Sequence, residues 1–147
     1  MGEVVYAPQF GGRPARPERV STHARVLIVD RDAATLAAIS QALQNEGHWT
    51  ATAFDAAAAI ATAERLGPFD LLIVDVDLAY GLDVADTLRR RDLSLQVLYV
   101  TSRREAVANP LLPPADEDTT LEKPFSESEL VEAVASLLYW RTPGSKR

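Results

Sequence analysis

The stretch Asp70-Leu71-Leu72-Ile73-Val74-Asp75 decides the fold, because an apolar run ends there in an acid. A short apolar run between polar residues is typical of a strand buried on both faces, as in a parallel sheet. Asp75 then lies where the strand ends and a loop begins, which is where open α/β sheets bind their ligands. A second run, residues 25–29, ends in the same way at Asp30-Arg31-Asp32. The sequence therefore predicts two strands that bring acids to one edge of a sheet.

Strand-like and helix-like patterns alternate along the rest of the chain. Asp32 and Asp55 are predicted helix caps, Gly47 and Gly67-Pro68 are predicted helix ends, and Ser126 to Glu129 form a capping box. Such alternation with short connections predicts right-handed crossovers and a parallel sheet with helices on both faces. The predicted strands are 25–29, 49–54, 70–75, 96–100 and 119–122, and the predicted helices follow Asp32, Asp55, Gly81 (82–91) and Ser126.

The fourth β-α unit is predicted to have a shortened or irregular helix. Residues 103–109 are too few for a full helix, and Pro110, Pro113 and Pro114 follow them. Proline lacks an amide proton and clashes with the preceding helical turn, so these residues prevent its continuation. The predicted fold is thus a three-layer (βα)5 domain around a five-stranded parallel sheet.

Composition and charge narrow the class of protein. The 147 residues are 47% hydrophobic and 24% charged, enough for one core. A formal net charge of −6 argues against a general nucleic-acid binder. The chain has no cysteine, no apolar run long enough to span a bilayer and no signal-peptide pattern. We therefore expect a cytoplasmic protein that does not bind membranes, in which neither histidine, His23 nor His48, has a metal or acid-base role.

The domain organisation is predicted to be one folded unit with two tails. Residues 1–24 are rich in proline, glycine and arginine and have no strand or helix period, so we expect a flexible arm rather than a docking segment. Residues 25–141 form the predicted domain and residues 142–147 a frayed tail. No further domain is expected after it, so the chain reads as a stand-alone unit.

Four separated pieces carry a resemblance to a known family. They are the strand 26–29 with Asp30 and Asp32, the strand ending in Asp75, the pair Thr101-Ser102, and Lys123-Pro124-Phe125. In this order they resemble the receiver domain of two-component response regulators, over roughly residues 25–141. The resemblance implies a flavodoxin-like fold and a place in phosphorelay signalling, without an enzymatic activity on a free metabolite.

The resemblance also implies roles for individual residues. Asp75 would be the phosphoacceptor, attacking a phosphohistidine on a histidine kinase or phosphotransfer protein, because a carboxylate is a competent nucleophile. Thr101 would be the switch hydroxyl and Lys123 the cation that pairs with the phosphoryl oxygens. The Lys123–Pro124 peptide bond would be cis, as is usual in the family. The output would pass to a downstream protein target through surface contacts.

The chain departs from the family at the metal site. The family offers two adjacent acids after the first strand, and here the second position is Arg31. Asp30, Asp75 and Asp77 remain as Mg²⁺ ligands, and Mg²⁺ binding should be weakened by a missing carboxylate and an added cation. Asp77 is expected to be solvated rather than a side-chain ligand. Two arrangements of Arg31 stay open: an ion pair with Asp30 and Asp75, or a side chain in solvent.

Two further departures concern the output. Thr120 stands where the family carries a switching aromatic residue, and the loop 76–81 is short and lacks the customary proline. A further departure is the proline-broken stretch 109–114, with the acids 116–118 after it, which replaces much of the helix that receivers commonly use for output and for dimerisation. Because phosphorylation acts by biasing a bistable element, and Thr120 and this stretch alter two components of that element, we expect the output to differ from that of the family.

Three functions therefore remain open. They are a phosphoryl-accepting receiver, a pseudo-receiver that binds partners without phosphorylation, and a small flavodoxin-like enzyme or nucleotide binder. The third lacks a glycine-rich phosphate loop after the first strand. The first is the function we expect.

Overall fold

The structure, a computed structural model, describes residues 23–102 and 120–139. Its five strands form one parallel sheet in the order β2-β1-β3-β4-β5, which confirms the predicted flavodoxin-like class. The strands are β1 (Arg25–Val29), β2 (Trp49–Ala53), β3 (Leu71–Asp75), β4 (Gln96–Thr101) and β5 (Thr120–Glu122). The helices are α2 (Ala33–Asn45), α3 (Ala56–Leu66), α4 (Gly81–Arg91) and α5 (Glu127–Tyr139).

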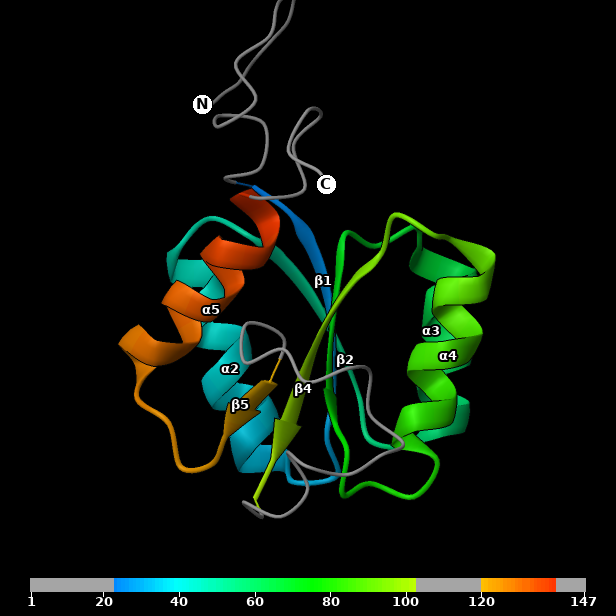
Figure 1. Cartoon of the computed structure of the whole chain (residues 1–147), viewed down its shortest axis with the longest axis horizontal. Coiled ribbons are helices and arrows are strands. Elements are labelled where there is room, and N and C mark those ends of the chain that lie inside the picture. Colours follow the sequence, from blue (N-terminus) through cyan, green and yellow to red (C-terminus); the bar gives the residue numbers. More distant parts are fainter. Residues whose placement is uncertain (1–22, 103–119, 140–147) are drawn as a thin grey trace, which may run out of the picture.

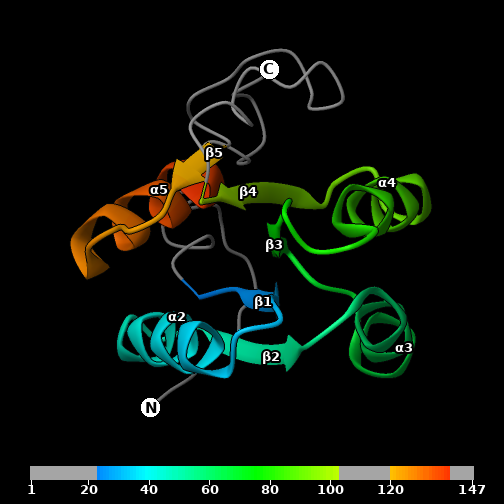
Figure 2. The ribbon, with the colours of Figure 1, turned by 90° about the horizontal axis from the view of Figure 1, so that it is seen from below.

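The helices form two outer layers around the sheet (Figures 1 and 2). Helices α2 and α5 cover one face, and α3 and α4 cover the other. Successive side chains of a strand point to opposite faces, so Val26 and Ile28 join the core under α2 and α5, whereas Leu27 and Val29 join the core under α3 and α4. The central strands are therefore apolar on both faces and appear in the sequence as continuous hydrophobic runs.

The predicted helix caps are confirmed. Asp32 accepts a hydrogen bond from the Thr35 amide at the start of α2, and Asp55 accepts one from the Ala58 amide at the start of α3. Ser126 and Glu129 exchange the two reciprocal bonds of a capping box. These bonds satisfy amide groups that have no partner inside the helix, so they fix where each helix begins.

Some boundaries differ from the predictions by a residue. Strand β2 ends at Ala53, and Phe54, predicted within the strand, is 55% exposed. Ala24, predicted within the arm, is buried and its carbonyl accepts a hydrogen bond from the Trp49 amide. The folded part therefore includes Ala24. The predicted arm before His23, the irregular fourth helix and the tail lie outside the described residues.

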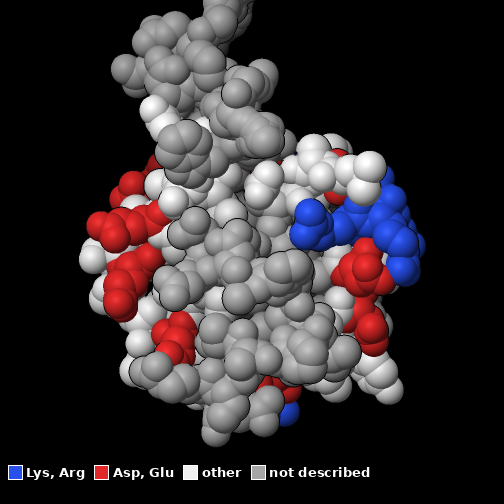
Figure 3. Space-filling model, in the orientation of Figure 1, with Lys and Arg blue, Asp and Glu red and all other residues white. Residues whose placement is uncertain are grey.

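Charged side chains gather at the ends of two helices (Figure 3). Three arginines, Arg89, Arg90 and Arg91, occupy the last turn of α4, and two glutamates lie in the first turn of α5. Both placements suit the helix dipole, which favours cations at the carboxyl end and anions at the amino end. Arg90 pairs with Asp86 and Arg91 with Glu64, so part of the basic cluster is neutralised within the domain. No described helix is long and apolar enough to cross a membrane.

Candidate phosphoacceptor site

The sheet register brings the predicted site residues to one edge. Val29 of β1 pairs with Val74 of β3, so Asp30 and Asp75 follow side by side at the carboxyl ends of adjacent strands. Asp75 pairs in turn with Val100 of β4, and Thr101 is the next residue. All three are buried, with 2%, 5% and 0% of their surface exposed. Because parallel strands end at the same edge, residues far apart in sequence form one polar cluster.

Lys123 joins the two acids. Its Nζ lies 2.9 Å from Asp30 Oδ2 and 3.4 Å from Asp75 Oδ2. The Lys123 amide also donates a 2.7 Å hydrogen bond to the Thr101 carbonyl, which anchors the residue beside the end of β4. The structure therefore places one ammonium group between two buried carboxylates. The Lys123–Pro124 peptide bond is cis, as predicted.

Burial and charge shift the protonation of this cluster. Burial raises the pKa of the Asp75 carboxyl, and the Asp77 amide, which donates a 2.8 Å hydrogen bond to Asp75 Oδ1, and the Lys123 charge oppose the rise only in part. Burial of Lys123 favours its neutral form, but the hydrogen bond to Asp30 and the charge of Asp75 outweigh it and raise the lysine pKa. Lys123 is therefore charged, and it lies next to Asp75, the carboxyl group whose ionised form is made unfavourable by burial.

Asp77 is half-buried, and its side chain bonds the neighbouring strand end rather than lying in solvent as the sequence predicted. Its Oδ2 accepts hydrogen bonds from the Ser102 amide at 2.9 Å and from the Ser102 hydroxyl at 2.8 Å. The side chain is half-buried and ties the loop after β3 to the end of β4. This bond was not predicted from the sequence. Its signal there is an acid two residues after Asp75 together with a serine directly after Thr101.

Arg31 makes no ion pair with any described residue and its side chain is exposed. Of the two arrangements left open by the sequence, the structure has the arginine in solvent. The cation that the acids share is Lys123, which comes from the far end of the sheet rather than from the residue beside Asp30. Asp32, next to Arg31, caps α2, so it does not replace the missing ligand.

The loop after β3 is shaped to keep α4 close to Asp75. A Cβ atom added to Gly81 would lie 2.6 Å from the Asp75 carbonyl oxygen, so only glycine fits without a backbone shift. Tyr80, directly before it, has a φ of 65°, a left-handed conformation that is costly for a non-glycine residue. Its side chain is 72% exposed. The short turn therefore accepts backbone strain where it passes the site.

The donor set fits Mg²⁺ in part. Mg²⁺ is usually bound by one or two carboxylates, with water and substrate phosphate oxygens completing its coordination. The neighbouring carboxylates of Asp30 and Asp75 meet this requirement. Among residues 23–102 and 120–139, no group of three histidine, cysteine or acidic side chains is arranged to hold a metal ion. The assignment of Asp30, Asp75 and Asp77 to a Mg²⁺ site stays a prediction.

Thr120 lies at the start of β5, paired with Tyr99 of β4, and is half-buried. A threonine side chain is too small to make the inward rotation expected of an aromatic residue at this place. Beyond it, Thr101 and Lys123 occupy the strand ends at which the sequence predicted them. The predicted aspartate, threonine and lysine are therefore all at the strand ends. On β5, however, Thr120 stands where the family carries an aromatic residue.

Comparison with known proteins identifies the family. A model described as the response regulator receiver domain matches residues 26–135. The probable transcriptional regulatory protein TcrX of Mycobacterium tuberculosis is 38% identical over 116 residues, which cover 77% of this chain and 49% of that protein. The transcriptional regulatory protein PrrA of the same organism is 34% identical over 119 residues, covering 80% and 51%. The chain spans about half the length of the curated relatives it matches.

Solved structures agree in fold. A CheY-like response regulator receiver domain protein from Methanospirillum hungatei has a TM-score of 0.71 and 25% identity, covering 80% of this chain and 94% of that one. The response regulator TrrA of Thermotoga maritima, solved in complex with Mg(2+)-BeF, has a TM-score of 0.68 and 27% identity, covering 77% and 97%. With its strand order, its acidic strand ends and these relatives, the chain belongs to the receiver domains of two-component response regulators.

Proposed function

We propose that Asp75 accepts a phosphoryl group from a phosphohistidine of a histidine kinase or phosphotransfer protein. A carboxylate oxygen of Asp75 attacks the phosphorus, the bond from phosphorus to the histidine nitrogen breaks, and the nitrogen keeps the electron pair. The other imidazole nitrogen of the donor carries a proton when the bond breaks, so the products are an acyl phosphate on Asp75 and a neutral histidine on the donor. The observation that carries the proposal is the placement of Asp75 Oδ2 3.4 Å from Lys123 Nζ.

Charge stabilisation at the new phosphoryl group falls to residues already at the strand ends. Lys123 would pair with a phosphoryl oxygen, and the hydroxyl of Thr101, next along the edge, would donate a hydrogen bond to another. The backbone amide of Asp77 holds Asp75 Oδ1, which leaves Oδ2 as the attacking oxygen. Mg²⁺ held by Asp30 and Asp75 would neutralise the phosphoryl charge. That TrrA was solved with Mg(2+)-BeF supports this reading of the shared fold.

The output is proposed to pass through protein-protein contacts of the domain in the cytoplasm. The curated relatives are named as transcriptional regulators, and the matched part covers about half of each of them. The matched part is the receiver domain, and the formal net charge of −6 of the chain argues against general nucleic-acid binding. We therefore propose that the downstream partner of this domain is a protein.

The test is phosphorylation by a small-molecule donor. The full chain is incubated with acetyl phosphate and Mg²⁺, and the intact mass is measured with Asp75→Asn as the matched control. One phosphoryl group should be added to the wild type and none to the variant, and hydroxylamine should remove it, as expected for an acyl phosphate. Asp30→Asn should reduce the yield without moving the modification. A phosphoryl group that persists in Asp75→Asn would contradict the assignment.

A second function is favoured by one specific observation. Arg31 replaces the second acid of the family, and Lys123 already bridges the remaining carboxylates. A pseudo-receiver that binds its partner without phosphorylation would need no more than this fixed arrangement. The same experiment separates the two functions. No mass gain from acetyl phosphate or from a phosphorylated kinase, together with partner binding that Asp75→Asn leaves unchanged, would establish the pseudo-receiver.

A further inference from the structure

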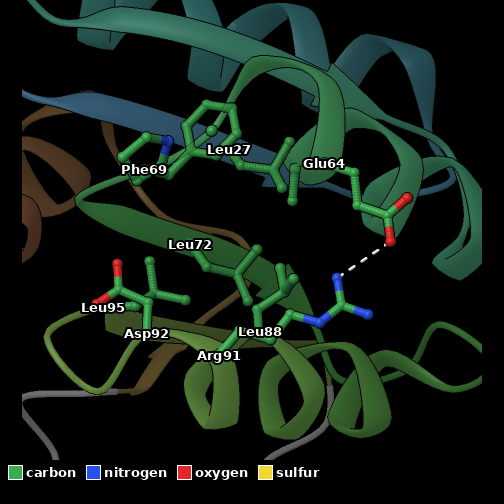
Figure 4. Close-up of a pocket in the computed structure, with 11 residues that line it drawn as sticks. Leu27, Glu64, Phe69, Leu72, Leu88, Arg91, Asp92 and Leu95 are labelled. Carbon is green, nitrogen blue, oxygen red and sulfur yellow. Dashed lines mark hydrogen bonds and ion pairs between the residues drawn. The ribbon is translucent and has the colours of Figure 1, made fainter.

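A cavity of about 250 Å³ lies between α3 and α4, at the edge of the sheet opposite to Asp75 (Figure 4). Phe69 and Leu95, which precede β3 and β4, line it together with Leu27, Leu72 and Leu88. Four of these five side chains are leucines, and all five are buried. Because the lining comes from the amino ends of parallel strands and the carboxyl ends of two helices, this cavity is separate from the phosphoacceptor site.

Two of the three charged side chains that line the mouth of the cavity neutralise each other. Glu64 of α3 and Arg91 of α4 also line the cavity, and their side chains form an ion pair of 3.2 Å across it (Figure 4). Asp92 uses its Oδ1 to accept hydrogen bonds from the amide and hydroxyl of Ser94. Arg91 is therefore already paired and offers an anionic ligand no open cation, whereas Asp92 keeps its charge and is bonded to Ser94.

The backbone groups at the same rim are bonded as well. The carbonyls of Leu66, the last residue of α3, and of Pro68 both accept hydrogen bonds from the Arg25 guanidinium. The Gly67 amide donates to the Ala63 carbonyl, and the Asp92 amide donates to the Leu88 carbonyl. The two amide donors at this rim are already used, so an acceptor group on a ligand would have to displace one of these bonds, which costs free energy. An apolar ligand needs no such donor.

We propose that this cavity binds a neutral, apolar molecule about the size of one or two aromatic rings. An apolar cavity of about 150 Å³ is known to stay dry and to bind benzene, so 250 Å³ accommodates a substituted or fused ring. The volume is near the lower end of pockets that bind small molecules, which excludes a large cofactor. A charged group brought against the leucine lining would lose its hydration without gaining a partner. Size and polarity therefore select the same class of ligand.

The experiment is a titration of the isotope-labelled full chain with toluene and with indole, followed by amide NMR. Saturable shifts are expected at residues lining the cavity, with a dissociation constant in the millimolar range or tighter. Benzylamine and benzoate carry the same phenyl ring as toluene with a positive or a negative charge. Each should bind at least about tenfold more weakly than toluene. If either charged ring bound as tightly as toluene, the neutral class of ligand would be wrong.

Ala63 lines the cavity and gives the matched variant. Ala63→Leu should fill the space and abolish the saturable shifts, whereas Ala57→Leu, the same change at an exposed position of α3, should leave the affinity unchanged. Ala63→Met fills the same space with a more flexible side chain, so it serves if the leucine variant fails to fold. Absence of saturable shifts in the wild type, or equal affinity in a folded cavity-filling variant, would overturn the proposal.

Discussion

Lys123 Nζ donates a 2.9 Å hydrogen bond to Asp30 Oδ2, which joins the ends of β5 and β1 across 93 residues of sequence. The lysine side chain is 22% exposed and the aspartate side chain 3% exposed. One cation is therefore drawn into a largely buried acidic cluster at the edge of the sheet. Buried ion pairs of this kind contribute little when compared with apolar packing, but removing one partner is costly.

The first prediction follows from the difference between the small net contribution of a buried ion pair and the large cost of removing one partner. Lys123→Ala should lower the free energy of unfolding by about 3 kcal/mol, because it leaves Asp30 and Asp75 buried next to each other without a cation. Urea unfolding followed by circular dichroism measures the loss. Adding Asp75→Asn to the lysine variant should recover part of it, since only one buried charge then remains. A double variant as unstable as Lys123→Ala alone would contradict this account.

The second prediction concerns Mg²⁺. Arg31→Asp restores an acid beside Asp30 and should raise Mg²⁺ affinity by about tenfold or more, measured by isothermal titration calorimetry. Arg31→Ala removes only the cation, so it should give a smaller gain. The control is Arg65→Asp, which makes the same change of charge at an exposed position of α3. If Arg31→Asp bound Mg²⁺ no better than wild type, the assignment of this position to the metal site would fail.

The third prediction concerns the bond between two loops. Ser102→Ala should lower the free energy of unfolding by about 1 kcal/mol, because Asp77 Oδ2 loses the hydroxyl donor at 2.8 Å and keeps only the amide. Ser128→Ala, at an exposed position of α5, is the control and should change stability by less than about 0.5 kcal/mol. Chemical denaturation of both variants gives the comparison. Equal effects of the two substitutions would show that the bond contributes nothing.

The fourth prediction is a pH dependence at the opposite edge of the sheet. His48 Nδ1 accepts a 3.0 Å hydrogen bond from the Ala24 amide, and burial, followed by the nearby charge of His23, lowers the pKa of His48. The unfolded chain therefore binds a proton that the folded chain does not, once the pH falls below the ordinary value of 6.5. Stability from this group is present above pH 6.5 and is lost as the pH falls toward the lowered pKa.

Unfolding in urea between pH 7.5 and pH 5 tests this sign. His48→Gln should be less stable than wild type at the higher pH, and the difference should shrink as the pH falls, because wild type then also loses the bond to Ala24. His23→Gln should retain most of the wild-type pH dependence. A difference between wild type and His48→Gln that grows toward acid would reverse the assigned direction of the pKa shift.

Much of the fold was predictable because its signals are local. Four-residue apolar runs such as 71–74 and helix caps such as Asp32 and Asp55 each depend on neighbouring residues alone. The alternation of strands and helices then restricts the topology, because parallel crossovers are almost always right-handed. The end of β2 was misplaced by one residue, since Phe54 has the β propensity of a strand residue but is exposed after the last pair of the ladder.

The sequence by itself determined which residues reach the carboxyl edge of the sheet, because a residue that directly follows a buried strand can lie nowhere else. Asp30, Asp75 and Lys123 were placed there by strand position alone. Only the tertiary structure decided how their charges are shared. Arg31 adjoins Asp30 in the chain but points into solvent, while Lys123 arrives through β5 and contacts both acids. Burial and distance set electrostatic pairing, and neither quantity is encoded in the separation of two residues along the chain.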